Sequence, residues 1–469
     1  MGVGVKGRLA IKDSGKSAVS RPARWLLPAY LFLCLILGGS SRAAWGSVAL
    51  QAIAPWLIAY AALADRSVEQ RRSSRLLLGL LAAWFALVLI QLAPLPPGVW
   101  TQLPGRESLA EGYRELGYAL PWLPLAMAPY DLLRALVALL PPAAVLLMML
   151  RLQQNEAAMA GAIVIAAMAG VTLGALQIGG GGPGQSPWYP YEITNVGAVG
   201  FFANSNHMGS LLLVAFPFAM ALVARRSGDG RRGNFATPSA VLGAAGCLMI
   251  AVGVALNRSL AALGLFIPVG FASILLLRQG SKHKRLIAPL AAVAAVICLA
   301  VLTGSGLRAE LAGSDTSSFV TRADMWRSTL RLISETFPFG TGVGSFPSIY
   351  AFGEDPRAVG LTYINHAHND FLEIVLETGL LGLLLLLASL TWWLLTSVAV
   401  WRSPSSSESS RAATIAAGAL ILHSIVDYPL RTAALSSVFA VCLGMMAVAL
   451  SRSTEEWSRF RAARHVKIA

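Results

Sequence analysis

The sequence predicts an all-α protein that crosses a membrane about twelve times, and three observations lead to this fold class. Apolar side chains make up 56% of the 469 residues and charged ones only 13%, with a mean hydropathy of +0.63. These values lie far outside the range of soluble domains. Many runs of about 18 or more mostly apolar residues occur, which is the length that a membrane helix needs. None shows the alternation of a barrel strand, so helices are expected.

Twelve apolar segments are long enough to be spans. We expect them at residues 25–40, 45–64, 76–93, 131–150, 157–178, 208–224, 238–257, 259–277, 286–305, 372–400, 412–429 and 432–450. No convincing small-x-small cleavage site follows the first apolar run, so the first helix is expected to be retained. The predicted organisation is a basic tail at 1–24, helices 1–9 within 25–305, one large outer loop at 306–371, helices 10–12 within 372–450, and a second tail at 451–469.

The basic residues predict the orientation of these spans. The two tails and the alternate connections hold 26 of the 37 Lys and Arg residues, although the two longest loops lie on the other side. The positive-inside rule therefore places both termini in the cytoplasm and supports an even number of crossings. Setting the membrane orientation and contacting lipid headgroups are sufficient roles for these cytoplasmic clusters of Lys and Arg. The net charge of +14 therefore does not indicate a nucleic-acid partner.

The four cysteines indicate neither disulfides nor zinc. Cys34, Cys247, Cys298 and Cys442 all lie inside apolar runs, without a CxxC pair or a Cys/His ligand spacing. They are expected to be packing residues.

The two longest outer segments have different compositions. Residues 94–130 are rich in Pro, Trp and Tyr, which suits an interfacial loop or a short helix in the headgroups. Within 306–371, apolar residues recur at spacings of 4, 3, 4 and 3, which predicts an amphipathic helix. They are Phe319, Ala323, Trp326, Leu330 and Ile333. Pro338 and the run Gly340-Thr-Gly-Val-Gly344 end this helix; the run is a tight turn rather than a nucleotide loop, because no strand precedes it.

Arginines near the outer face are candidates for binding an anion. Arg258, in Leu256-Asn-Arg-Ser259, joins two helices with almost no loop between them. It can bind an anion or merely snorkel at a helix end. Arg322 lies on the amphipathic helix with Arg327 and Arg331, and guanidinium groups match phosphate oxygens bidentately. A solvated helix face is the alternative for Arg327 and Arg331.

The segment Asn365-His-Ala-His-Asn-Asp-Phe-Leu372 holds two of the six histidines where the large loop re-enters the membrane. An interfacial histidine can accept a proton from an attacking hydroxyl near neutral pH. Two alternatives exist for these histidines. One is a metal site, which is disfavoured because no further Cys or His ligand lies nearby, and the other is simple interfacial hydrogen bonding. Asn204, Asn206 and His207 can either bind a sugar or phosphate or cap the helix that follows.

These residues resemble the O-antigen ligase and O-antigen polymerase superfamily over about residues 160–430. His368-Asn369, nine residues, then Gly379-Leu-Leu-Gly382 fits the ligase motif of His, Asn/Ser/Gln, nine residues and Gly-x-x-Gly. Other segments add to the resemblance: Phe202-Ala-Asn-Ser-Asn206, Asn257-Arg-Ser259, Arg322 to Trp326, and Pro338-Phe-Gly-x-Gly-x-Gly344. Many relatives have Ser where this chain has Asn257.

The resemblance implies a site at the periplasmic face of a bacterial inner membrane, with undecaprenyl-diphosphate glycan as donor and no metal or other cofactor. His368 would be the base that activates the acceptor hydroxyl, and Arg258 and Arg322 would hold the diphosphate leaving group. Supporting positions are expected at Asn204, Asn206, His366, Asn369, Glu377 and Asp427. Glu373 and Glu377 can orient His368 or pair with an arginine.

The leading hypothesis is therefore a glycan ligase that moves a preassembled chain to a lipid or protein hydroxyl by a single inverting displacement. The acceptor would be lipid A-core, a polysaccharide or a protein. The closest alternative is a polymerase that uses a second carrier-linked unit as acceptor, since both reactions need the same donor chemistry. A transporter would line its path with ionisable residues inside the spans, and these spans are nearly free of them.

Overall fold

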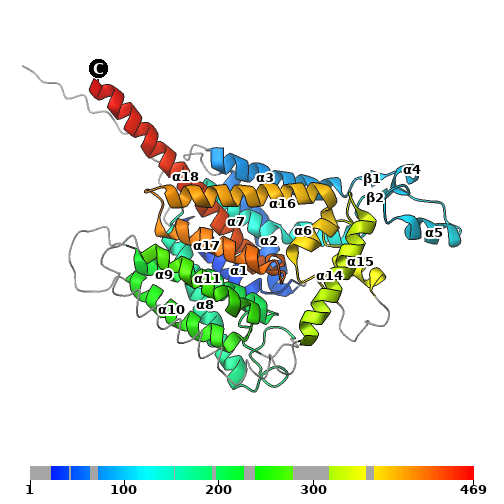
Figure 1. The fold of residues 1–469 in the computed structure, drawn as a ribbon, viewed down its shortest axis with the longest axis horizontal. Helices are drawn as coiled ribbons and strands as arrows, with labels where there is room; N and C mark the ends of the chain where they lie inside the picture. Colours follow the sequence, from blue (N-terminus) through cyan, green and yellow to red (C-terminus); the bar gives the residue numbers. More distant parts are fainter. Residues whose placement is uncertain are drawn as a thin grey trace, which may run out of the picture.

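The computed structural model describes residues 23–41, 44–63, 72–152, 154–192, 197–225, 238–277, 316–354 and 364–468. In this part of the chain the protein is a bundle of long helices with one small two-stranded sheet (Figure 1). Eight of the described helices are long and apolar enough to cross a membrane, and two shorter apolar helices, at Trp25–Leu37 and Ser74–Ile90, accompany them. The predicted class, an all-α polytopic membrane protein, is confirmed.

The helices of the bundle coincide with most of the expected spans. Their bounds are α1 Ala23–Leu37, α2 Trp45–Leu63, α3 Arg72–Ile90, α6 Pro129–Ala138, α7 Leu140–Arg151, α8 Glu156–Gly179, α9 Ser205–Ala224, α10 Pro238–Asn257, α11 Leu260–Leu277, α16 Asp370–Arg402, α17 Glu408–His423 and α18 Ala433–Ile468. The expected span at 286–305 lies outside the described residues.

Helix bounds differ from the expectation in three places. The expected span at 131–150 is found as the apolar segment Pro129–Arg151, but it consists of two helices, α6 and α7, that meet at Leu139, just before Pro141-Pro142. Proline supplies no backbone N–H, so two in succession remove bonds that would continue α6. Helix α17 ends at His423 rather than at 429. Helix α18 contains the expected span as Ala433–Ser451 and continues as helix through most of the segment 451–469.

Helix α9 lies at the centre of the bundle. Its side chains are buried at every position except Asn206, and it contacts α8, α10, α11 and α17. A helix that is apolar all round is suited to such a position. Glycines allow the close approach: a Cβ at Gly209 would meet Ala262 of α11, and one at Gly243 would meet the backbone of α9. Small residues at helix contacts serve this purpose in membrane proteins.

Two additions lie at the end of the bundle where α16 and α18 begin, called here the site end. Helices α14 (Thr316–Thr336) and α15 (Phe346–Gly353) form a small core with the start of α16 through Met325, Leu332, Phe346 and Leu376. The predicted amphipathic helix is thus confirmed, although Leu330 is exposed rather than packed.

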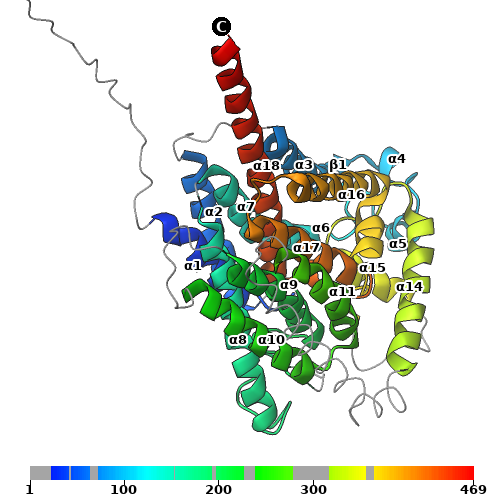
Figure 2. The same ribbon diagram turned by 60° about the vertical axis from the view of Figure 1, so that its left-hand side comes forward.

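The second addition is a lobe that contains β1 (Pro94–Leu95), α4 (Pro97–Trp100), α5 (Glu107–Glu115) and β2 (Leu123–Pro124). The strands pair antiparallel, Pro94 with Pro124 and Leu95 with Leu123. The lobe projects beyond the bundle on the side of α15 in Figure 1, whereas in the turned view of Figure 2 it overlaps α15 and α16. A hydrogen bond from Met127 N to Thr341 O, 2.7 Å long, fastens its end to the glycine turn that follows α14.

Candidate active site

The first turns of α16 hold the site, and a break at Gly379 sets their position. Gly379 has φ +59° and ψ −146°, a conformation that L residues rarely adopt. A Cβ there would overlap the carbonyl oxygen of Pro338. The turn 338–344 packs at this break: Leu380 N donates to Pro338 O at 2.9 Å, and Gly342 N donates to Glu377 O at 2.8 Å. The first glycine of the His…Gly-x-x-Gly motif therefore allows the loop to pack against α16.

His368 stands just before this helix. Its φ of +48° lies in the left-handed region, and the next residue, Asn369, caps α16 by accepting hydrogen bonds from Phe371 N and Leu372 N, each 3.0 Å long. Nδ1 of His368 lies 3.1 Å from Oδ1 of Asp427. The imidazole remains 22% exposed, whereas the Asp427 side chain is fully buried. The buried carboxylate of Asp427 is thus within hydrogen-bond distance of one ring nitrogen of the partly exposed His368.

The surroundings of Asp427 favour its ionised form. Burial alone would raise the pKa of this carboxyl, but the hydrogen bond from His368 and the charges of nearby histidines lower the pKa below its usual range. Oδ1 also accepts a hydrogen bond from Tyr428 N at 2.9 Å. The side chain is therefore an anionic partner for His368.

Tyr428 packs against three imidazoles. Ring centroids lie 4.3 Å from His366, 4.9 Å from His368 and 4.8 Å from His207. His366 has its own carboxylate, since Nδ1 lies 2.8 Å from Oε1 of Glu373. The other oxygen of Glu373 accepts a hydrogen bond from Ala367 N at 3.0 Å. Two histidine–carboxylate pairs therefore flank one aromatic ring.

Arg431, in the short helix η1 (Pro429–Arg431), contacts three buried carboxylates of α16. Nη1 donates to Glu377 at 2.9 Å and lies 3.5 Å from Glu373, while Nε lies 3.4 Å from Asp370. Burial alone would lower the pKa of Arg431, but these carboxylates raise it above its ordinary value. The predicted supporting residue Glu377 thus pairs with an arginine rather than with His368.

Within the described residues, four of the six histidines, His207, His366, His368 and His423, lie in this region. His207 and His423 are buried, and Ser210 Oγ lies 2.7 Å from Nδ1 of His423. Both ring nitrogens of His207, Nε2 of His423 and Oδ2 of Asp427 have no hydrogen-bond partner among the described residues. Such buried polar atoms are costly in a core and are often found at functional sites.

The turn that carries Arg258 is tied to the start of α9. Asn257 is buried and donates to Ala198 O at 2.8 Å and Ser205 O at 2.7 Å, and Ser259 donates to Asn206 at 2.7 Å. Arg258 itself has φ +59°, and its side chain is exposed. The departure from the family pattern at Asn257 therefore has a structural role in this chain.

Arg322 lies on α14, the helix that packs beside the histidine segment. Trp326, one turn further on, donates from Nε1 to Ala367 O at 3.0 Å and so fastens α14 to the histidine segment. The Arg322 side chain is partly buried and lies close enough to act electrostatically on His423. Arg327 and Arg331 are exposed and pair with Asp324 and Glu335 of their own helix, as a solvated face requires.

The structure thus brings together His366, His368, Asn369 and Asp427, with Glu377 beyond Arg431. Asn204 caps α9 by accepting from Asn206 N at 2.9 Å. Sequence analysis did not identify Arg431 or Asp370. The carboxylates at 370, 373 and 377 share one helix face at an apolar span, a pattern that calls for a buried cation. Among the described residues, no group of three His, Cys, Asp or Glu side chains is arranged to hold a metal ion.

Comparison with protein families agrees with the predicted resemblance. Residues 244–387 match the family model described as O-antigen ligase, while no curated protein matches the chain. The matched segment includes Arg258, Arg322 and His368, whereas Asp427 and Arg431 lie beyond it. This family comprises membrane glycan transferases of the ligase or polymerase type. Through residues 244–387, the match supports the resemblance of this chain to the O-antigen ligase superfamily.

Proposed function

We propose that the protein is a glycan ligase. It transfers a preassembled oligosaccharide or polysaccharide from undecaprenyl diphosphate to a hydroxyl of a lipid or protein, with His368 as general base. The observation that carries the proposal is the pair formed by the partly exposed His368 and the buried Asp427, 3.1 Å apart. A carboxylate at one ring nitrogen orients an imidazole and stabilises its protonated form, which is the arrangement that a general base needs.

The proton and the glycosyl group move in one displacement. With Nδ1–H of His368 donated to Asp427, Nε2 has a free lone pair for the acceptor O–H. The acceptor oxygen forms a bond to the anomeric carbon as its proton passes to Nε2. The bond from the anomeric carbon to the diphosphate oxygen breaks, and the configuration inverts.

The negative charge that develops on the diphosphate needs fixed positive charge nearby. Arg258 and Arg322 are our candidates, since both are permanently charged and can bind phosphate oxygens bidentately. The hydrogen bond from Trp326 to Ala367 supports the assignment of Arg322, because it holds α14 beside the histidine segment. Two arginines supply the required charge, so we expect transfer to proceed without added metal or nucleotide.

We further propose that the site end faces the periplasm. Basic residues gather at the other end of the bundle, including Arg151 at the end of α7 and Arg402 at the end of α16. By the positive-inside rule that end is cytoplasmic, and both termini lie there. Carrier-linked glycans displayed in the periplasm would then meet His368 directly.

The proposal is tested by incubating the purified protein in detergent with a polyprenyl-diphosphate oligosaccharide and a panel of acceptors, with a chelator present. We expect free polyprenyl diphosphate and a glycosylated lipid or protein. A product with two joined carrier-linked units would instead identify a polymerase. Donor that binds without any transfer across the panel would contradict the assignment as a transferase.

A further inference from the structure

Gln91 is a buried polar residue that the proposed mechanism does not use. It directly follows α3, outside the segment that matches the family, and only 1% of it is exposed. Its side-chain amide makes two hydrogen bonds: Nε2 donates to Glu377 O at 2.9 Å, and Oε1 accepts from Val343 N at 3.0 Å. Exchanging the two amide atoms would place donor against donor and acceptor against acceptor, so the amide has one orientation.

Gln91 helps to end the first part of α16. The break in this helix leaves carbonyl groups without helical partners. The glycine turn supplies backbone donors for two of them, since Thr341 N donates to Leu376 O at 3.0 Å and Gly342 N donates to Glu377 O at 2.8 Å. Gln91 adds a side-chain donor to Glu377 O, and its second hydrogen bond holds the glycine turn itself.

The part of α16 before the break, residues 370–378 and called here the site helix, connects the two members of the proposed catalytic pair. With about two and a half turns it is too short to be stable alone, so its caps and contacts set its position. His368 stands just before its first turn, and Glu377 in its last turn accepts the hydrogen bond from Arg431. Arg431 follows Asp427 closely in the chain. The positions of His368 and Asp427 therefore both depend on the peptide at Glu377.

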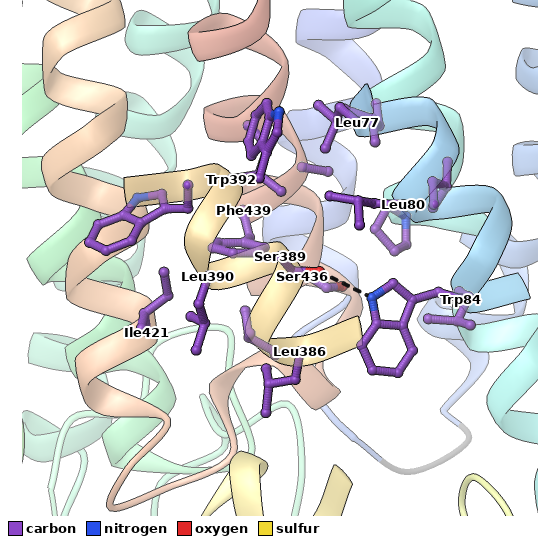
Figure 3. A pocket seen from close by; sticks show the side chains of 18 of the residues that line it. Leu77, Leu80, Trp84, Leu386, Ser389, Leu390, Trp392, Ile421, Ser436 and Phe439 are labelled. Carbon is purple, nitrogen blue, oxygen red and sulfur yellow. Dashed lines mark hydrogen bonds between the residues drawn. The ribbon is translucent and has the colours of Figure 1, made fainter. Parts of the chain in front are cut away.

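Helix α3 also holds the part of α16 that follows the break. There Trp84 Nε1 donates to Ser389 Oγ at 3.3 Å, in the wall of an apolar pocket between the two helices (Figure 3). Trp84 and Gln91 lie about 10 Å apart along the chain at 1.5 Å per residue. Helix α3 thus contacts α16 on both sides of the break, and the contact at Gln91 is the one that reaches the site helix.

We propose that Gln91 is a positioning residue of the active site: by fixing the site helix it sets the distance between His368 and Asp427. A displacement of about 1 Å at reacting groups can slow a reaction about 100-fold. The effect should appear in kcat rather than in donor KM, because Arg258 and Arg322, our candidates for the diphosphate, lie on other elements. This inference rests on the proposed transferase function, but half of its test does not require turnover.

Hydrogen–deuterium exchange of the purified protein in detergent, without substrate, tests whether Gln91 holds the site helix. Gln91→Met keeps the side-chain length but loses both hydrogen bonds, so amides of the site helix should exchange at least about tenfold faster. Trp84→Phe loses the bond to Ser389 and should leave this exchange at the wild-type rate. Gln91→Asn, shorter by one methylene, is the second variant if Gln91→Met does not fold, and should show a smaller increase. Unchanged exchange in the folded variants would overturn the proposal.

Steady-state kinetics tests whether this contact serves the reaction. Gln91→Met should lower kcat about 10- to 100-fold with donor KM within about twofold, and Trp84→Phe should keep the wild-type kcat. In the His368→Ala background, Gln91→Met should add little further loss, because its effect acts through the base. An equal loss in both backgrounds, or an unchanged kcat, would overturn the proposal. If wild type transfers to no acceptor, the proposed function fails, while the exchange result still decides whether Gln91 holds the site helix.

Discussion

Nη1 of Arg431 donates a hydrogen bond to Oε2 of Glu377 at 2.9 Å, and this bond joins η1 to the first turns of α16. The opposite oxygen of Glu377 accepts from Gly344 N at 2.9 Å, so the same carboxylate also holds the glycine turn. Two segments that are distant in the sequence thus meet at one buried side chain beside the histidines.

Arg431→Met is expected to destabilise the protein strongly. The substitution keeps the side-chain length but leaves Asp370, Glu373 and Glu377 buried without their cation, which costs on the order of 3–5 kcal/mol. The measurement is the thermal unfolding midpoint in detergent. Arg331→Met, on the exposed face of α14, should change it little. Equal midpoints for the two variants would show that the cluster does not hold α16 in place.

Asp427→Asn is expected to fold and to lose activity. The amide can still contact His368 but does not stabilise its protonated form, so kcat should fall roughly 100-fold or more with little change in donor KM. Steady-state kinetics with Asp324→Asn, an exposed position on α14, provides the control. A rise in donor KM at unchanged kcat would assign Asp427 to binding instead.

The same carboxyl makes stability depend on pH. Its pKa in the folded protein lies below the unfolded value of about 4, because His368 and nearby histidines favour the ionised form despite burial. Ionised Asp427 therefore stabilises the fold above about pH 4, and this contribution is lost as pH falls toward the folded pKa. Unfolding midpoints measured from pH 7 to pH 3 should fall more steeply in wild type than in Asp427→Asn. Parallel curves would contradict this.

Gly379→Ala is expected to prevent the packing of the loop on α16. A side chain there requires a positive φ and overlaps the carbonyl of Pro338, and such strain costs more than about 1 kcal/mol. Gly264→Ala in α11 is the control, since its added Cβ meets nothing within 4 Å. Expression level and unfolding midpoint should fall for Gly379→Ala alone.

Arg322→Gln is expected to weaken donor binding. If Arg322 holds the diphosphate, its removal should raise donor KM about tenfold or more. Arg327→Gln changes an exposed arginine of the same helix and should leave donor KM near the wild-type value. The comparison separates a specific contact from the general loss of positive charge on α14.

The bundle could be predicted because a membrane helix is defined by a long local run of apolar residues. The residues at which the helices end were harder to predict from the sequence. The break at Leu139 lies next to two prolines inside an apolar run, and α17 ends at His423, just before Asp427 and Tyr428, which contact His368. Where tertiary contacts determine the end of a helix, the hydropathy of the sequence does not show its position.

The site was predicted in part for a similar reason. His366, His368 and Asn369 form one short segment that a single motif identifies, and the glycines that position it lie nearby in the sequence. Arg431 was missed because it lies 61 residues after Asp370, so that only the fold brings them together. His207 and His423 are single polar residues in apolar helices, and the sequence does not show which side chains surround them in the fold.

The most direct test of the central claim is transfer by purified wild type and His368→Ala, with and without added imidazole. If His368 is the base, the variant should fold and bind donor but release polyprenyl diphosphate at least about 100-fold more slowly. Imidazole should restore part of the rate by occupying the space that the side chain leaves. Transfer by a folded His368→Ala variant at the wild-type rate would contradict the account.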